Sequence, residues 1–152
     1  MLKQILVFAI LFFSMNVHAD HSNYSKAVQA LRDIRNSSQD VKKWANDGRD
    51  RAVCLFESTI SRSIYQFGFE AQTWVLEQNI KNLDIQDSEQ RLHAYENLIM
   101  AFCQADISRN SIDYSTAATG LKVPTSLAQV SELLDRMLVE VNNLAKQMGA
   151  TL

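Results

Sequence analysis

Glycine and proline are scarce in this chain, which has Gly 4 and Pro 1 in 152 residues. Both residue types interrupt helices and favour turns, so their scarcity leaves long stretches without a break. Strand-like alternation of apolar and polar residues is also nearly absent, whereas apolar residues recur at intervals of three and four. The sequence therefore predicts an all-α protein.

Charge of one sign is not in excess either. Lysine and arginine together number 15, aspartate and glutamate 17, and the formal net charge is −2. Nucleic-acid binding needs a basic surface, and attraction to anionic lipid needs clustered lysines and arginines. The composition therefore argues against nucleic acid as a partner and against a polybasic membrane-binding patch.

Catalytic and metal-binding motifs are missing. The chain has no glycine-rich phosphate loop, no nucleophile elbow and no H-E-x-x-H or EF-hand spacing. After residue 19, His21 and His93 are the only histidines. We therefore predict no catalytic residue, no cofactor and no metal, and we expect that the protein is not an enzyme.

The N-terminus has the three parts of a secretory signal peptide. Lys3 is positive, Ile5–Phe13 is an unbroken apolar run, and the small residue Ala19 precedes the expected cleavage point. The apolar run spans about 14 Å as a helix, roughly half of a bilayer's hydrocarbon core, so it is short for a permanent anchor. The alternative is an N-terminal helix that is not cleaved.

We expect residues 1–19 to be removed on export and residues 20–152 to fold as a single helical domain, since a chain of that length can bury a core. The mature protein would be periplasmic or secreted, with no membrane attachment. Two cysteines in an exported chain favour one disulfide, here between Cys54 and Cys103. In the chain-entropy model such a bridge contributes ~4 kcal/mol.

Apolar periodicity and helix-stop residues predict four helices. Gly48 and Gly120 are fitting ends for the first and third helices, and Ser126 with Gln129 has the spacing of a capping box. The expected helices run from about residue 22 to 47, from about 50 to 82, from about 88 to 119 and from about 126 to 148. Short connections between them favour a four-helix up-down bundle.

The cysteines conflict with this simple arrangement. In a hairpin that turns near Ile85, Cys54 lies level with a residue near position 115, roughly 18 Å along the helix from Cys103. A disulfide needs Cα atoms about 6 Å apart. Either a helix is bent or broken, with Gly68 as a candidate bend, or the turn lies earlier, or the cysteines do not pair within one chain.

The last helix carries an apolar seam with regular 3-4 spacing. A seam of this kind is either one wall of a bundle or a coiled-coil contact that forms a homodimer. With three other amphipathic helices in the chain, the wall is the favoured interpretation. The seam consists of Leu127, Val130, Leu134, Met137, Val141, Leu144 and Met148.

The second helix is apolar on two sides. Phe56, Ile60, Ala71 and Trp74 lie within about 40° of Phe67 when residues are placed 100° apart. A second group lies on nearly the opposite side: Tyr65, Phe69, Leu76 and Ile80. Burial of both sides inside the bundle is the favoured interpretation. The other is a protein-binding strip made of these four residues, with Tyr65 and Phe69 as anchors.

Two functions are compatible with these features. The first is protein–protein binding by an exported helical protein, such as an inhibitor, immunity protein, chaperone or adaptor, whose partner is another envelope or secreted protein. The alternative is a small secreted enzyme or ligand carrier with a pocket inside the bundle. Tyr95, Asp106 and Asp113 are candidate pocket residues, because continuing the third helix places both carboxylates on its apolar side.

Overall fold

The computed structural model describes the backbone of residues 2–81 and 83–152 and the side chains of residues 23–81 and 83–152. This part of the chain contains helices and no strand, so the expectation of an all-α protein is confirmed. The helices are α1 (Leu2–Asn46), α2 (Asp50–Glu77), α3 (Ile85–Phe102), α4 (Arg109–Thr119) and α5 (Leu127–Gln147).

The expected signal peptide, residues 1–19, has its side chains outside the described part of the chain. Export therefore stays a prediction. Within the residues that the structure describes, no helix has the length and hydropathy to cross a bilayer.

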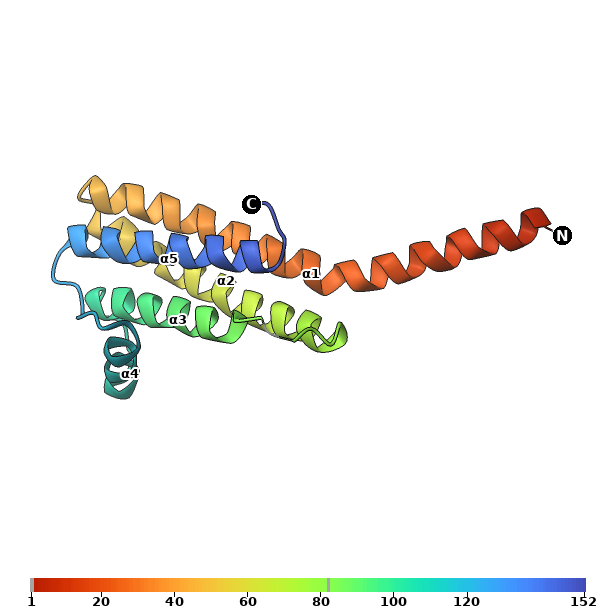
Figure 1. Ribbon diagram of the computed structural model, residues 1–152. Coiled ribbons are helices and arrows are strands. Elements are labelled where there is room, and N and C mark those ends of the chain that lie inside the picture. The colour runs from red at the N-terminus through yellow and green to blue at the C-terminus, as the bar shows by residue number, and fades with distance from the viewer. Residues whose placement is uncertain (1, 82) are drawn as a thin grey trace.

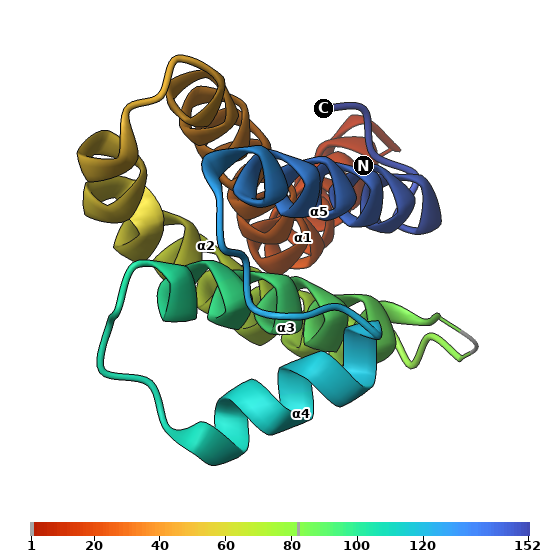
Figure 2. The ribbon, with the colours of Figure 1, turned by 90° about the vertical axis from the view of Figure 1, so that its left-hand side faces the viewer.

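Helices α1, α2, α3 and α5 lie side by side, and their direction alternates along the chain (Figure 1). Helix α1 packs against α2 and α5, and α3 packs against the same two helices. Helix α4 packs mainly against α3 and lies outside this group (Figure 2).

The prediction of one helix reaching Thr119 is wrong, because α3 and α4 stand in its place. Gln104 has a positive φ of 56°, which ends α3. The Ser108 side chain then accepts a hydrogen bond from the backbone N–H of Ser111 and caps α4. Gly120, with φ 68°, ends α4 in the left-handed conformation that favours glycine.

The disulfide between Cys54 and Cys103 is confirmed, with an S–S distance of 2.03 Å and a Cα–Cα distance of 5.4 Å. Two departures from the expected hairpin bring the cysteines together. Helix α2 ends at Glu77, earlier than expected, and α3 stops directly before Cys103. Helix α2 continues through Gly68, so no break occurs there.

The core is formed by apolar side chains from α1, α2, α3 and α5. Its largest fully buried members are Phe67, Leu31, Ile34, Ile60, Ile64, Leu92, Leu98, Ile99, Leu134, Met137, Leu144 and Val41. The apolar seam of α5 lies in this core, apart from Leu127, which is half-buried. On the outer side of α5, Val139 is the one large hydrophobic side chain that is exposed. The seam is therefore a wall of the chain's own core, and a homodimer through this helix stays a prediction.

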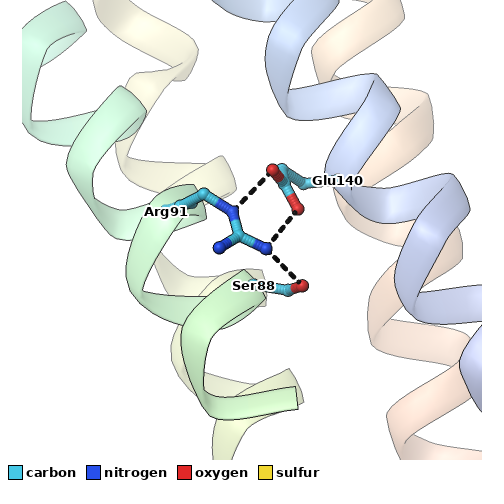
Figure 3. A network of polar contacts seen from close by, with 3 residues as sticks. All are labelled: Ser88, Arg91 and Glu140. Carbon is cyan, nitrogen blue, oxygen red and sulfur yellow. Dashed lines mark hydrogen bonds and ion pairs between the residues drawn. The ribbon is translucent and has the colours of Figure 1, made fainter. Parts of the chain in front are cut away.

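A polar contact joins α3 to α5 beside this core (Figure 3). The guanidinium of Arg91 donates to both carboxylate oxygens of Glu140, at 2.7 Å and 3.3 Å, and to the Ser88 hydroxyl at 3.0 Å. Glu140 is buried, so its charge needs such a partner. A two-pronged arginine–carboxylate contact also fixes the relative position of the two helices.

Candidate protein-interaction surface

Three of the four residues in the candidate strip have exposed side chains. The exposed fraction is 66% for Tyr65, 71% for Phe69 and 80% for Leu76. The interpretation that places this side of the second helix in the core is therefore wrong for these residues. Ile80 is different, because it lies beyond the end of α2 and is half-buried.

Leu55 extends the exposed apolar side towards the start of α2. Its side chain is 70% exposed, and it lies about four helical turns before Phe69. With 100° per residue, Leu55, Tyr65, Phe69 and Leu76 fall within an arc of about 80° and span roughly 30 Å. Sequence reasoning missed Leu55, although its spacing from Phe69 was a usable signal. These four residues are called the outer face below.

The packing of α2 explains why the outer face is exposed. The opposite side of the helix is buried through Val53, Ile60, Ile64 and Phe67. Helix α1 packs along one flank of α2 and α3 along the other, while α4 packs against α3. Among the described helices, none covers the outer face. Several large hydrophobic side chains exposed on one side of a helix are typical of an interaction site.

A surface hollow lies at the far end of the outer face. Its volume is ≈ 310 Å³, and Leu76 contributes to its wall. The other lining residues come from the end of α2, the following loop and the start of α3: Gln72, Val75, Leu83, Ile85 and Gln86. The hollow is therefore mostly apolar, with two side-chain amides, and could receive one apolar side chain of a partner.

The exposed charges in the middle of α2 are positive. Between Asp50 and Glu77 the helix has two carboxylates, Glu57 and Glu70, which are 8% and 9% exposed. The basic residues of the same stretch, Arg51 and Arg62, are exposed. Since burial hides both carboxylates, a partner would meet arginines and hydrophobic side chains along most of this helix.

A cluster of ionisable side chains joins α2 to α3 next to the outer face. His93 lies between two glutamates of its own helix, 3.6 Å from a carboxylate oxygen of Glu89 and 4.0 Å from one of Glu96. Glu57 of α2 reaches across and forms a hydrogen bond with Glu96. The His93 ring also packs against the Tyr65 ring, with centroids 4.5 Å apart and the ring planes tilted by 51°. One side of the Tyr65 ring is thus held in place while the rest stays exposed.

The environment shifts the pKa values of this cluster. Burial and the hydrogen bond with Glu96 raise the pKa of Glu57 to about 9, so its carboxyl is protonated at neutral pH and donates to Glu96. Burial acts to lower the pKa of His93, but Glu89 and Glu96 outweigh it and raise the value to about 9. Burial would raise the pKa of Glu96, yet contacts with His93, Glu57 and Ser61 lower it. A charged histidine between two carboxylates is therefore the neutral-pH state.

Gly68 allows α2 and α3 to approach closely at this cluster. A Cβ atom at position 68 would overlap the carboxylate of Glu89. That carboxylate also accepts a hydrogen bond from the side chain of Gln72, at 3.1 Å. Glu89 therefore contacts α2 at the edge of the outer face, next to Tyr65 and Phe69 around the helix axis.

The candidate pocket residues do not come together. Tyr95 is buried, but Asp106 and Asp113 are exposed, and the prediction that they line the apolar side of a helix is wrong. The physical reason is the break after α3, which takes both carboxylates out of the register of Tyr95. Within the described side chains, no group of three histidines, cysteines or carboxylates could hold a metal ion.

Comparison with known proteins returned no relative. The chain matches no family model, no curated protein and no solved structure. The surface geometry and chemistry described above therefore carry the functional argument.

Proposed function

We propose that this protein is exported and acts by binding another protein of the envelope or extracellular space through the outer face of α2. The exposure of Leu55, Tyr65, Phe69 and Leu76, between 66% and 80%, is the observation that carries this proposal. Large hydrophobic side chains gathered in one row are costly to leave in water and stabilise a complex when a partner covers them.

Aromatic anchors support a protein as the occupant. Tyrosine is among the residues that contribute most to binding energy at protein interfaces, and the Tyr65 ring already packs against His93 on one side. An ordered anchor loses little conformational entropy on binding. The adjoining hollow of ≈ 310 Å³ offers a place for a side chain of the partner.

The rest of the molecule is suited to hold the outer face rigidly in place. We infer that α1, α2, α3 and α5 form an up-down four-helix bundle, to which α4 is an addition. The bridge between Cys54 and Cys103 lies at the end of the outer face where Leu55 is found. A disulfide favours an oxidising compartment such as the periplasm or the extracellular space. An inhibitor, immunity protein, chaperone or adaptor would use such a scaffold.

Affinity capture from an envelope extract tests this proposal. The exported protein and its Tyr65→Ser/Phe69→Ser variant would be used as baits side by side. We expect the native protein to retain a defined partner and the double variant to lose it, because both anchors are gone. A Tyr114→Ser/Val139→Ser variant is the matched control, since these side chains are 53% and 57% exposed on other helices. Equal capture by all three baits would contradict the proposal.

A further inference from the structure

On the exposed side of α2, two pairs of similar residues lie symmetrically about one point of the helix. Leu55 and Leu76 are equally distant from the point midway between Tyr65 and Gln66. Two inner pairs share that midpoint: Ser58 with Thr73, and Arg62 with Phe69. All of these side chains are exposed except Thr73, which is half-buried. Two copies of such a surface can face each other through a twofold axis.

We infer that a second copy of this chain pairs with the outer face, α2 against α2 in antiparallel orientation, with the twofold axis between Tyr65 and Gln66. The inference rests on the proposed use of the outer face for protein binding and names one occupant of it. Isologous contacts of this type close after two copies, so the product is a dimer.

The contacts in this arrangement are chemically matched. Leu55 of each copy meets Leu76 of the other, which covers both exposed side chains. Arg62 meets Phe69, and a guanidinium over an aromatic ring is attracted to it. The two Tyr65 rings meet next to the axis, where aromatic pairs are favourable. Every large hydrophobic side chain of the outer face thereby gains a partner.

The charges also permit two copies to approach. Since Glu57 and Glu70 are buried, the exposed carboxylates of α2 are those of Asp50 and Glu77, at its two ends and away from the axis. The two Arg62 residues are about 10 Å apart along the helix axes, a separation at which salt largely screens their repulsion. Near the ends, Arg51 of one copy comes within about one helical turn of Glu77 of the other, and these charges are opposite.

The contact between the two copies is small. A single helix face roughly 30 Å long is at the lower end of the area that specific complexes bury. The dimer is consequently weak and depends on concentration. A weak dimer covers the hydrophobic side chains at high concentration and releases them at low concentration to another partner.

Sedimentation velocity over a range of concentrations tests the pairing with charge-swap variants. We expect the native exported protein to shift from monomer to dimer. Phe69→Arg should raise the dissociation constant at least ~10-fold, because two arginines then face each other. Arg62→Glu should weaken pairing as well. The double variant Arg62→Glu/Phe69→Arg places opposite charges face to face and should restore the dimer.

If the double variant restores the dimer, the partner is a second copy of this chain. Only then does the changed residue 62 of one molecule face the changed residue 69 of the other. A native protein that stays monomeric at all concentrations would overturn the inference. A double variant that remains as weak as Phe69→Arg would overturn it too. A monomer that instead cosediments with anionic phospholipid vesicles would assign the outer face to a membrane surface.

Cysteine cross-linking tests the register independently. Both native cysteines are already paired. Gln66→Cys lies next to the axis and should form a disulfide-linked dimer with itself. Ser58→Cys should not, since its two copies would be about 22 Å apart, but it should cross-link when mixed with Thr73→Cys. Cross-linking of Ser58→Cys with itself would overturn the antiparallel register.

The outcomes separate this inference from the proposed function. A monomeric protein that still captures an envelope partner through Tyr65 and Phe69 would overturn the pairing and support the proposed function. A dimer that responds to the charge-swap variants as expected but captures no envelope protein would support the pairing and contradict the proposed function.

Discussion

The outer face of α2 and the apolar seam of α5 have similar sequence patterns and opposite positions in the fold. Both repeat large hydrophobic residues at spacings that keep them on one side of a helix. Leu134 and Met137 in the seam are fully buried, whereas Phe69 and Leu76 are 71% and 80% exposed. Periodicity therefore shows that a helix has an apolar side, but the neighbouring helices decide whether that side is covered.

The comparison also shows when a helix can leave an apolar side exposed to solvent. Helix α2 already has a buried side, so its packing in the core does not depend on the outer face. Helix α5 has one apolar side, and the fold uses it. Substitutions in the two regions should accordingly have different effects on the free energy of unfolding.

The largest expected effect is in the seam. Leu134→Ala removes a fully buried side chain and leaves a cavity, so it should lower the free energy of unfolding by about 2–5 kcal/mol. Urea unfolding followed by circular dichroism measures this change. A loss below about 1 kcal/mol would show that the seam is not core and would remove the contrast with the outer face.

Removal of the disulfide should have the next largest effect. Cys54→Ser/Cys103→Ser frees the N-terminal part of α2 from the end of α3, and we expect a loss of about 2–4 kcal/mol. The same unfolding experiment, run with and without reductant on the native protein, provides the check. If reduction left the native protein's stability unchanged, the bridge would not support the outer face.

Gly68→Ala is expected to cost about 1–3 kcal/mol, because the added methyl group would displace the Glu89 carboxylate and separate α2 from α3. Alanine normally stabilises a helix relative to glycine, so the sign of the change is informative. Gain of stability in thermal unfolding would contradict the close contact. Gly68→Ala combined with Glu89→Ala is the control, because the shortened side chain relieves the overlap.

The ionisable cluster should make stability depend on pH. The pKa values of His93 and Glu57 are about 9 in the folded protein, above their ordinary values of 6.5 and 4.5. The folded state therefore binds more protons, and this contribution, fully present at acidic pH, is lost as pH rises towards 9. Urea unfolding between pH 6 and 9 should show a decline that is smaller in Glu57→Gln, which keeps a hydrogen-bond donor. An equal decline in both proteins would contradict the assignment to Glu57.

Sequence reasoning predicted the features that depend on local chemistry. The all-α class follows from apolar periodicity, and the capping of α5 follows from Ser126, which accepts a hydrogen bond from Gln129 N–H. The pairing of Cys54 with Cys103 was also expected, although its geometry was not. These features need only the nearby residues or the number of cysteines in the chain.

Features that depend on tertiary packing were missed. The break between α3 and α4 rests on the positive φ of Gln104, a residue with no strong preference for that conformation. Asp106 was consequently placed in the wrong helical register. The exposure of Phe69 depends on where α1 and α3 pack, and no local pattern specifies that. The link between Glu57 and Glu96 joins two helices and has no sequence motif.

The most direct test of the central claim is urea unfolding of Tyr65→Ser/Phe69→Ser beside Leu134→Ala. If the outer face is an interaction surface, the double variant should stay within about 1 kcal/mol of the native protein, because it removes exposed side chains and one ring contact. A loss as large as that of Leu134→Ala would show that Tyr65 and Phe69 belong to the core and would contradict the account.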